Sequence, residues 1–205
     1  MVEGGSACGG WRVSGEEPGR SPFEILGLPV SCAVTRAQIE SAYLARIAGA
    51  HPDHATDGGL AGGAAGGSAG EPTAAELNDA RAALLDEETR FNLVHRALGG
   101  PTAGEDDSLP DGFLMEIMDA RMEIEEATAS GDAAEREKWA AWGEEQKAAL
   151  RASASALLER VGGGADGDRA AALRDVRRTL NAWRYYERLI EQLDPSYDPA
   201  SADFA

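Results

Sequence analysis

Apolar residues recur along this chain at spacings of three and four, the pattern of helices that bury one face. Ile39, Tyr43 and Ile47 follow one another at intervals of four, and Thr35 precedes them with a glutamine three residues on. This threonine and glutamine have the spacing of a capping box, in which two side chains satisfy N–H groups at the start of a helix. The pattern predicts an amphipathic helix that begins after Thr35. Pro52 must end it, because proline has no N–H to donate.

Shorter helical patterns flank this one. Residues 21–29, SPFEILGLP, predict one apolar helical turn that a glycine and a proline close. A second capping box, Thr73 with Glu76, opens a further helix, and the segment after it predicts a short helix ending at a glycine pair. Residues 55–70 are rich in glycine and alanine with almost nothing to bury, and we expect a mobile loop there. The first half therefore predicts one small helical domain built around a hairpin.

Longer helices are predicted in the second half. Residues 101–110 are polar and form the expected linker, and residues 111–129 predict the first helix. Asp132 caps the next helix, which runs to about Val161, and the last covers about 168–193 before a proline ends it. Long helices joined by short connections predict an antiparallel three-helix bundle.

The predicted fold class is therefore all-α, with no segment that favours a strand. We expect a disordered tail at 1–20, a hairpin domain at 21–100, a linker at 101–110, a three-helix domain at 111–194 and a tail at 195–205.

The helix at 111–129 has two apolar faces instead of one. At about 100° per residue, one face carries a core-type stripe of Phe113, Ile117, Ala120 and Ile124. The opposite face carries Leu114, Met115, Met118 and Met122, flanked by Asp119, Glu125 and Glu126. Two interpretations remain open. The methionines could fill a second helix–helix contact, since methionine adapts to irregular cores, or they could form an exposed, acid-rimmed strip that binds a partner.

Composition and charge narrow the function classes. The chain has 19 Lys and Arg against 36 Asp and Glu, a formal charge of −17. Because nucleic-acid binding requires clustered cations that neutralise phosphates, we expect no nucleic-acid partner. Cys8 and Cys32 are the only cysteines, too few for a four-thiolate metal site, and no apolar run is long enough to cross a bilayer. We expect a protein of a reducing compartment, most simply the cytoplasm, with no membrane partner.

His51-Pro52-Asp53 lies where the amphipathic helix must end, just before the glycine-rich tract. The tripeptide can be an ordinary helix stop, it can join His54 in a metal or catalytic site, or it can be a surface for a partner. Adjacent residues separated by a proline point in different directions, and a loop beside a glycine tract is poorly organised for catalysis. These arguments favour an exposed hairpin tip, where proline fixes the turn and an imidazole and a carboxylate face solvent.

Two parts of the chain resemble one known family, in the same order. The first is similar to the J domain of the HscB family of co-chaperones, and comprises PFEILGLPVSCAVTRAQIESAYLARIAGAHPD and LLDEETRFNLVHRALG. The second resembles the first and last helices of the HscB C-terminal domain, in GFLMEIMDARMEIEEA and LNAWRYYERLIEQL. The resemblance covers about residues 21–194.

The resemblance implies a co-chaperone with no active site, metal or cofactor of its own. J domains stimulate ATP hydrolysis by a DnaK/HscA-type chaperone, and HscB proteins bring to it an IscU-type scaffold that carries a nascent iron–sulfur cluster. For the chaperone contact, the matching residues are His51, Pro52, Asp53, Arg36 and Arg46. For the scaffold contact, they are Leu114, Met115, Met118, Asp119, Glu126 and Tyr185. The second set coincides with the additional apolar face of the helix at 111–129.

Two other functions fit parts of the pattern. One is a J-domain adaptor that recruits a different client to a DnaK-type chaperone. The other is a metal-dependent enzyme that uses His51, Asp53 and His54. The chain also departs from the HscB pattern, because the net charge over residues 33–52 is only +1 and Met122 stands where the family commonly has an acid.

Overall fold

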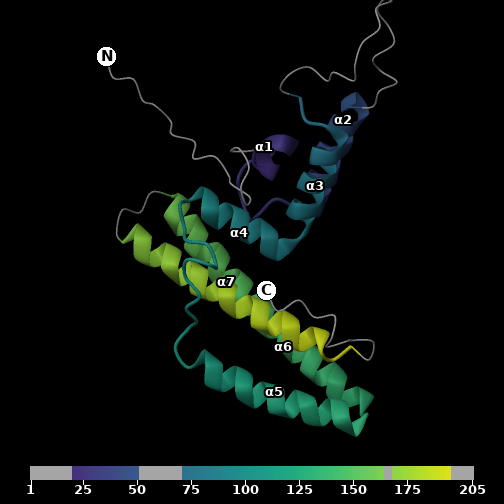
Figure 1. The fold of residues 1–205 in the computed structure, drawn as a ribbon, viewed down its shortest axis with the longest axis vertical. Helices are drawn as coiled ribbons and strands as arrows, with labels where there is room; N and C mark the ends of the chain where they lie inside the picture. The colour runs from purple at the N-terminus through teal and green to yellow at the C-terminus, as the bar shows by residue number, and fades with distance from the viewer. Residues whose placement is uncertain (1–19, 51–70, 164–167, 195–205) are drawn as a thin grey trace, which may run out of the picture. The chain divides into compact units, whose positions relative to one another are not determined.

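The computed structural model describes residues 20–50, 71–163 and 168–194, and the regular structure in these ranges is entirely helical (Figure 1). The helices are α1 (Pro22–Leu26), α2 (Arg36–Ala50), α3 (Ala74–Leu85), α4 (Glu87–Ala97), α5 (Phe113–Ser130), α6 (Ala133–Gly162) and α7 (Arg169–Glu191). The chain divides into two compact units, one up to Ala97 and one from Leu98. The predicted all-α fold class is confirmed for the described residues.

Helices α2 and α3 begin at the two capping boxes that the sequence predicts. The N–H of Thr35 donates to Gln38 Oε1 at 2.8 Å, and the N–H of Gln38 donates to Thr35 Oγ1 at 3.3 Å. Thr73 and Glu76 make the same reciprocal pair at 2.7 and 3.2 Å. Because each box satisfies N–H groups that have no partner inside the helix, local sequence alone determines where these two helices start.

Helix α3 is the centre of the first unit, since α1, α2 and α4 all pack against it. The side chains buried in this unit are mostly large and apolar, and include Phe23, Leu26, Ile39, Leu77, Leu84 and Phe91. Helices α2 and α3 lie side by side as the expected hairpin (Figure 1). A small core of this kind stabilises the hairpin through burial rather than through helix propensity.

Polar contacts also join α2 to α3. Arg81 donates to both carboxylate oxygens of Glu40, at 2.8 and 2.6 Å, and its guanidinium lies over the ring of Tyr43. The Tyr43 hydroxyl donates to Asn78 Oδ1 at 2.7 Å. The hydrogen bond from Arg81 lowers the pKa of the Glu40 carboxyl. Glu40 is therefore ionised and neutralised by a residue of the neighbouring helix.

In the second unit, the long helices α6 and α7 pack side by side (Figure 1). Their approach is close at Gly143, where a Cβ atom would lie 2.7 Å from Cγ1 of Ile190. Helix α7 buries most of its predicted stripe, including Leu173, Val176 and Leu180. Because Gly143 of α6 has no side chain, Ile190 of α7 can pack directly against the α6 backbone.

Helix α5 completes the three-helix unit through the core stripe that the sequence predicts. Phe113, Ile117, Ala120 and Ile124 enter one cluster with residues of α7, namely Ala182, Tyr186, Leu189 and Leu193. Trp139 and Trp142 of α6 pack against the same cluster. The opposite face of α5 therefore takes no part in this core.

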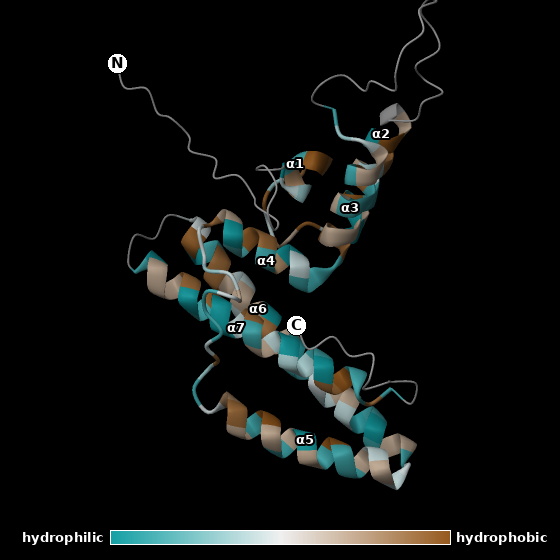
Figure 2. Cartoon of the chain, viewed as in Figure 1, coloured by the Kyte–Doolittle hydropathy of each residue, from teal (hydrophilic) through white to brown (hydrophobic). Residues whose placement is uncertain are grey.

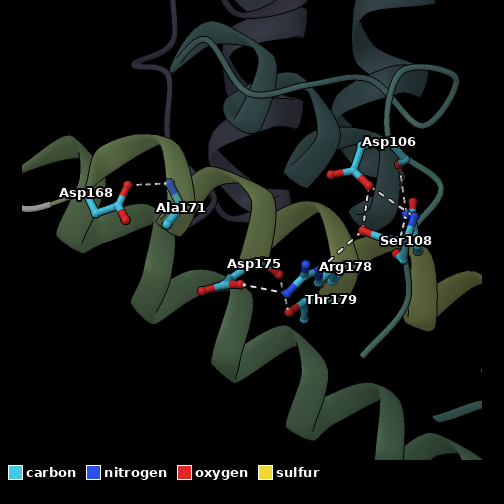
Figure 3. A network of polar contacts seen from close by, with 8 residues as sticks. Asp106, Ser108, Asp168, Ala171, Asp175, Arg178 and Thr179 are labelled. Atoms are coloured by element: carbon cyan, nitrogen blue, oxygen red, sulfur yellow. Dashed lines mark hydrogen bonds and ion pairs between the residues drawn. The ribbon is translucent and has the colours of Figure 1, made fainter. Parts of the chain in front are cut away.

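The segment expected to be a linker, residues 101–110, is anchored to α7. Asn181 Nδ2 donates to the carbonyl oxygens of Asp106 and Ser108, at 3.0 and 2.9 Å. Arg178 Nε donates to the Ser108 hydroxyl at 3.3 Å, in the polar network drawn in Figure 3. Hydrogen bonds from Ser108 lower the pKa of the Asp106 carboxyl, which is therefore ionised at neutral pH. This segment thus belongs structurally to the second unit.

Asn181→Ala is expected to lower the free energy of unfolding of the second unit by about 2–3 kcal/mol, because each buried polar group that loses its partner costs about 1–3 kcal/mol. Besides the two carbonyls, Asn181 Oδ1 accepts from Nε of Arg177, which is only 2% exposed. Urea denaturation followed by tryptophan fluorescence measures the change. Asp175→Ala, which removes only a surface ion pair on the same helix, is the control and should cost less than about 0.5 kcal/mol. Equal effects of the two substitutions would contradict the anchoring role.

Candidate functional site

Four apolar side chains on α5 remain exposed, and we call Leu114, Met115, Met118 and Met122 the apolar strip. The exposed fractions are 57% for Leu114, 74% for Met115, 65% for Met118 and 63% for Met122. Figure 2 shows apolar and polar residues alternating along this helix. Of the two interpretations of the methionines, burial in a second helix–helix contact is therefore wrong. The residues form a continuous exposed strip along three turns of one helix.

Tyr185 of α7 joins this surface at its N-terminal end. Its ring packs edge-to-face on Phe113, with centroids 5.6 Å apart, while 42% of the residue stays exposed. Phe113 is the first residue of α5, so Tyr185 lies next to the turn that carries Leu114 and Met115. The fold thus brings Tyr185 beside a turn of α5 that lies about seventy positions earlier in the sequence.

Carboxylates border the strip. Asp119 and Glu126 are exposed, and at 100° per residue both lie beside the methionines on α5. Glu125 is also exposed, but it pairs with Arg121 one turn earlier, at 3.0 Å. An apolar surface with acidic edges fits a partner whose own apolar patch is bordered by Lys or Arg.

Glu116, which follows Leu114 and Met115 on α5, is hydrogen-bonded to a residue of α7. The hydroxyl of Tyr186 donates to Glu116 Oε1 at 2.8 Å, and its ring packs edge-to-face on Phe113 and on Trp142. Burial, with the Glu116 carboxylate adding to it, raises the pKa of Tyr186, so the hydroxyl is a proton donor at neutral pH. Tyr186 therefore links all three helices of the second unit.

The chaperone-contact residues are only partly described. His51, Pro52 and Asp53, like His54, lie outside the described residues. Arg36 is exposed at the first position of α2. Arg46 donates from Nη1 to the carbonyl oxygen of Ile25 at 2.7 Å, and so stabilises the C-terminal end of α1. Arg46 thus has a structural contact that the sequence did not predict.

Within the described ranges, no group of three or more His, Cys, Asp or Glu residues is arranged to hold a metal ion. In the same ranges, no helix combines the length and the apolar composition needed to cross a bilayer.

Sequence reasoning missed Tyr186 and Glu116, which join α5 to α7 at the site, and Asn181, which anchors residues 101–110 to α7. One signal for Tyr186 was available, because it lies three residues after Trp183 and continues the buried stripe of α7. For Glu116 and Asn181 the sequence holds no comparable signal. Their partners lie about seventy residues away, and nothing local predicts those pairings.

Comparisons with known proteins bear on this arrangement. Residues 109–194 match the family model described as the HSCB C-terminal oligomerisation domain. In fold, the chain is similar to the human co-chaperone protein HscB, at 17% identity and a TM-score of 0.63, over 87% of this chain and 82% of that one. It is also similar to the chaperone HscB from Vibrio cholerae, at 19% identity and a TM-score of 0.58, over 85% of this chain and 95% of that one.

No curated protein sequence matches the chain. The resemblance to HscB proteins is nevertheless confirmed by the family match and by the shared architecture. The chain has the fold of HscB proteins, and its residues 109–194 match the HscB C-terminal domain family.

Proposed function

We propose that this protein is a co-chaperone of the HscB type that couples two partners. Its His51-Pro52-Asp53 segment stimulates the ATPase of a DnaK/HscA-type chaperone, and its C-terminal domain presents an IscU-type iron–sulfur scaffold to that chaperone. The observation that carries the proposal is the exposed apolar strip on a domain that matches the HscB C-terminal family. A surface of this kind is costly to leave in water and is typical of a docking site.

The scaffold contact would draw its affinity from the apolar strip. Fully burying a Leu or Met side chain contributes about 1.5–3 kcal/mol, so Leu114, Met115 and Met118 together would supply several kcal/mol, part of which offsets the cost of association. Tyr185 adds an aromatic side chain, a residue type enriched among the dominant contacts of interfaces. The carboxylates of Asp119 and Glu126 would select for a basic rim on the scaffold and speed the encounter.

The chaperone contact would rest on the tripeptide more than on charge. Arg36 and Arg46 are both exposed cations of α2, although Arg46 also donates to the Ile25 carbonyl, and Glu40 is paired with Arg81. The sequence of α2 holds only these two cations, so the helix offers little positive charge to attract an acidic surface. We expect His51, Pro52 and Asp53 to carry most of the effect on the ATPase.

The coupling itself requires only that one chain hold both partners. Linking two binding modules makes the second encounter intramolecular, with an effective concentration that reaches the millimolar range for short links. The scaffold would then reach the chaperone at a local concentration well above that in free solution.

Single-turnover ATP hydrolysis by a DnaK/HscA-type chaperone tests the proposal. The protein alone is expected to raise the rate roughly tenfold or more, and addition of an IscU-type scaffold is expected to raise it further. Stimulation without any response to the scaffold would favour a J-domain adaptor for another client. The absence of stimulation under both conditions would contradict the proposed function.

A further inference from the structure

The first turn of α5 is not held by a cap of its own. Gly112 occupies the N-cap position at φ 79° and has no side chain that could accept a hydrogen bond from the N–H groups at the helix start. Helices α2 and α3, in contrast, each begin with a capping box made by residues three positions apart. Yet the first turn of α5 carries Leu114 and Met115, the beginning of the apolar strip. Tertiary contacts therefore hold this turn, beginning with the packing of Phe113 and Ile117 in the core cluster.

Tyr186 supplies a tertiary contact at this place. It is 3% exposed, and its hydroxyl donates to Glu116 Oε1 at 2.8 Å. Its ring also packs edge-to-face on Phe113, with centroids 5.5 Å apart. The two contacts lie three residues apart on α5, so they hold both the position and the rotation of its first turn. A hydrogen bond to a carboxylate is directional, and at the first turn of α5 it adds to the packing of the core stripe that begins at Phe113.

We propose that Tyr186 is a positioning residue for the scaffold-binding surface: by holding Glu116, it orders the first turn of α5, which carries Leu114 and Met115 and packs on Tyr185 through Phe113. This inference rests on the proposed function for the identity of the partner. Tyr186 is buried and acts through α5, and Glu116 serves as an acceptor for its hydroxyl rather than as a charge for the scaffold. Because adjacent residues on a helix differ by 100°, a rotation of one fifth of that angle moves the tips of long side chains by ångströms.

Preorganisation explains why such a contact affects affinity. A surface that is already ordered before binding loses less conformational entropy when its partner arrives. Without the Tyr186–Glu116 hydrogen bond, the first turn of α5 would be less ordered, and Leu114 and Met115 would sample more arrangements relative to Tyr185. The loss is then expected as faster dissociation of the scaffold.

Three variants test the inference against a purified IscU-type scaffold by titration calorimetry. Tyr186→Phe removes the hydroxyl but keeps the ring, and Glu116→Leu removes the acceptor; each is expected to weaken binding about five- to tenfold. Glu116→Gln removes the charge but keeps an amide oxygen that can accept, and should retain binding within about twofold. If Glu116→Gln weakens binding as much as Glu116→Leu, the charge of Glu116 acts on the scaffold directly and the inference is overturned.

A matched control and an independent readout separate this inference from the proposed function. Tyr43→Phe removes a hydroxyl of the first unit that is bonded to Asn78, and should leave scaffold binding unchanged. In the free protein, the methyl NMR signal of Met115 should shift or broaden in Tyr186→Phe, while that of Met122, two turns away, should not. An unchanged Met115 signal overturns the positioning role whether or not the scaffold binds. Failure of the unaltered protein to bind any scaffold would instead contradict the proposed function.

Discussion

Leu114→Ala combined with Met118→Ala is expected to weaken binding of an IscU-type scaffold by roughly 100-fold. Both side chains are more than half exposed and lie one turn apart on α5, so truncating them removes apolar area that only a partner would bury. Because neither side chain belongs to the core cluster, the free energy of unfolding should change by no more than about 0.5 kcal/mol. Titration calorimetry and urea denaturation measure the two effects on the same preparation.

The control for this double variant is Leu44→Ala in the first unit. Leu44 is 61% exposed on α2, so the substitution removes an equally exposed apolar side chain from the same protein. Scaffold affinity should stay within about twofold of the unaltered protein. Unchanged affinity in the double variant would show that the apolar strip does not bind the scaffold.

His51→Gln is expected to abolish stimulation of the chaperone ATPase. His51 lies outside the described residues, and the expectation rests on its place in a tripeptide that we infer to be the effector of the J-type hairpin. The helix starts and core of this unit are made by other residues, so the fold and the binding of scaffold should be retained. Single-turnover hydrolysis at saturating protein concentration measures the stimulation.

This result separates the two activities that we propose for the chain. A variant that binds scaffold but does not stimulate hydrolysis would place the two functions in different units. Stimulation at the level of the unaltered protein would instead mean that another surface acts on the chaperone. Arg36→Ala would then be the next substitution, because Arg36 is an exposed cation on α2.

Much of the fold was predictable because its signals are local. The boxes at Thr35 and Thr73 involve residues three positions apart, and the same residues form the hydrogen bonds that the spacing predicts. The core face of α5 was predictable for a similar reason, since Phe113, Ile117 and Ile124 repeat at helical spacing. Helix boundaries agreed to within about two residues, the usual uncertainty of helix ends.

For the candidate site, the sequence predicted which residues belong to it but not whether they are exposed. Leu114, Met115 and Met118 could be assigned to a second face of the helix, but whether that face was covered depended on where α6 and α7 lie. Arg46 was assigned to the chaperone contact, whereas its bond to the Ile25 carbonyl depends on a contact with α1 across twenty-one residues. Likewise, residues 101–110 look like a linker in composition, although Asn181 anchors them to α7.

By itself, the sequence determined the helical class, the starts of α2 and α3, the two faces of α5 and the presence of a His-Pro-Asp tripeptide. These features depend on residues within one or two helical turns, where propensity, capping and periodicity act directly. Only the tertiary structure decided that the apolar strip stays exposed, that Tyr185 stands beside its first turn and that Tyr186 bonds to Glu116. Those outcomes follow from the packing of helices that lie far apart in the chain. This packing determines the orientation of α5, which its own sequence does not.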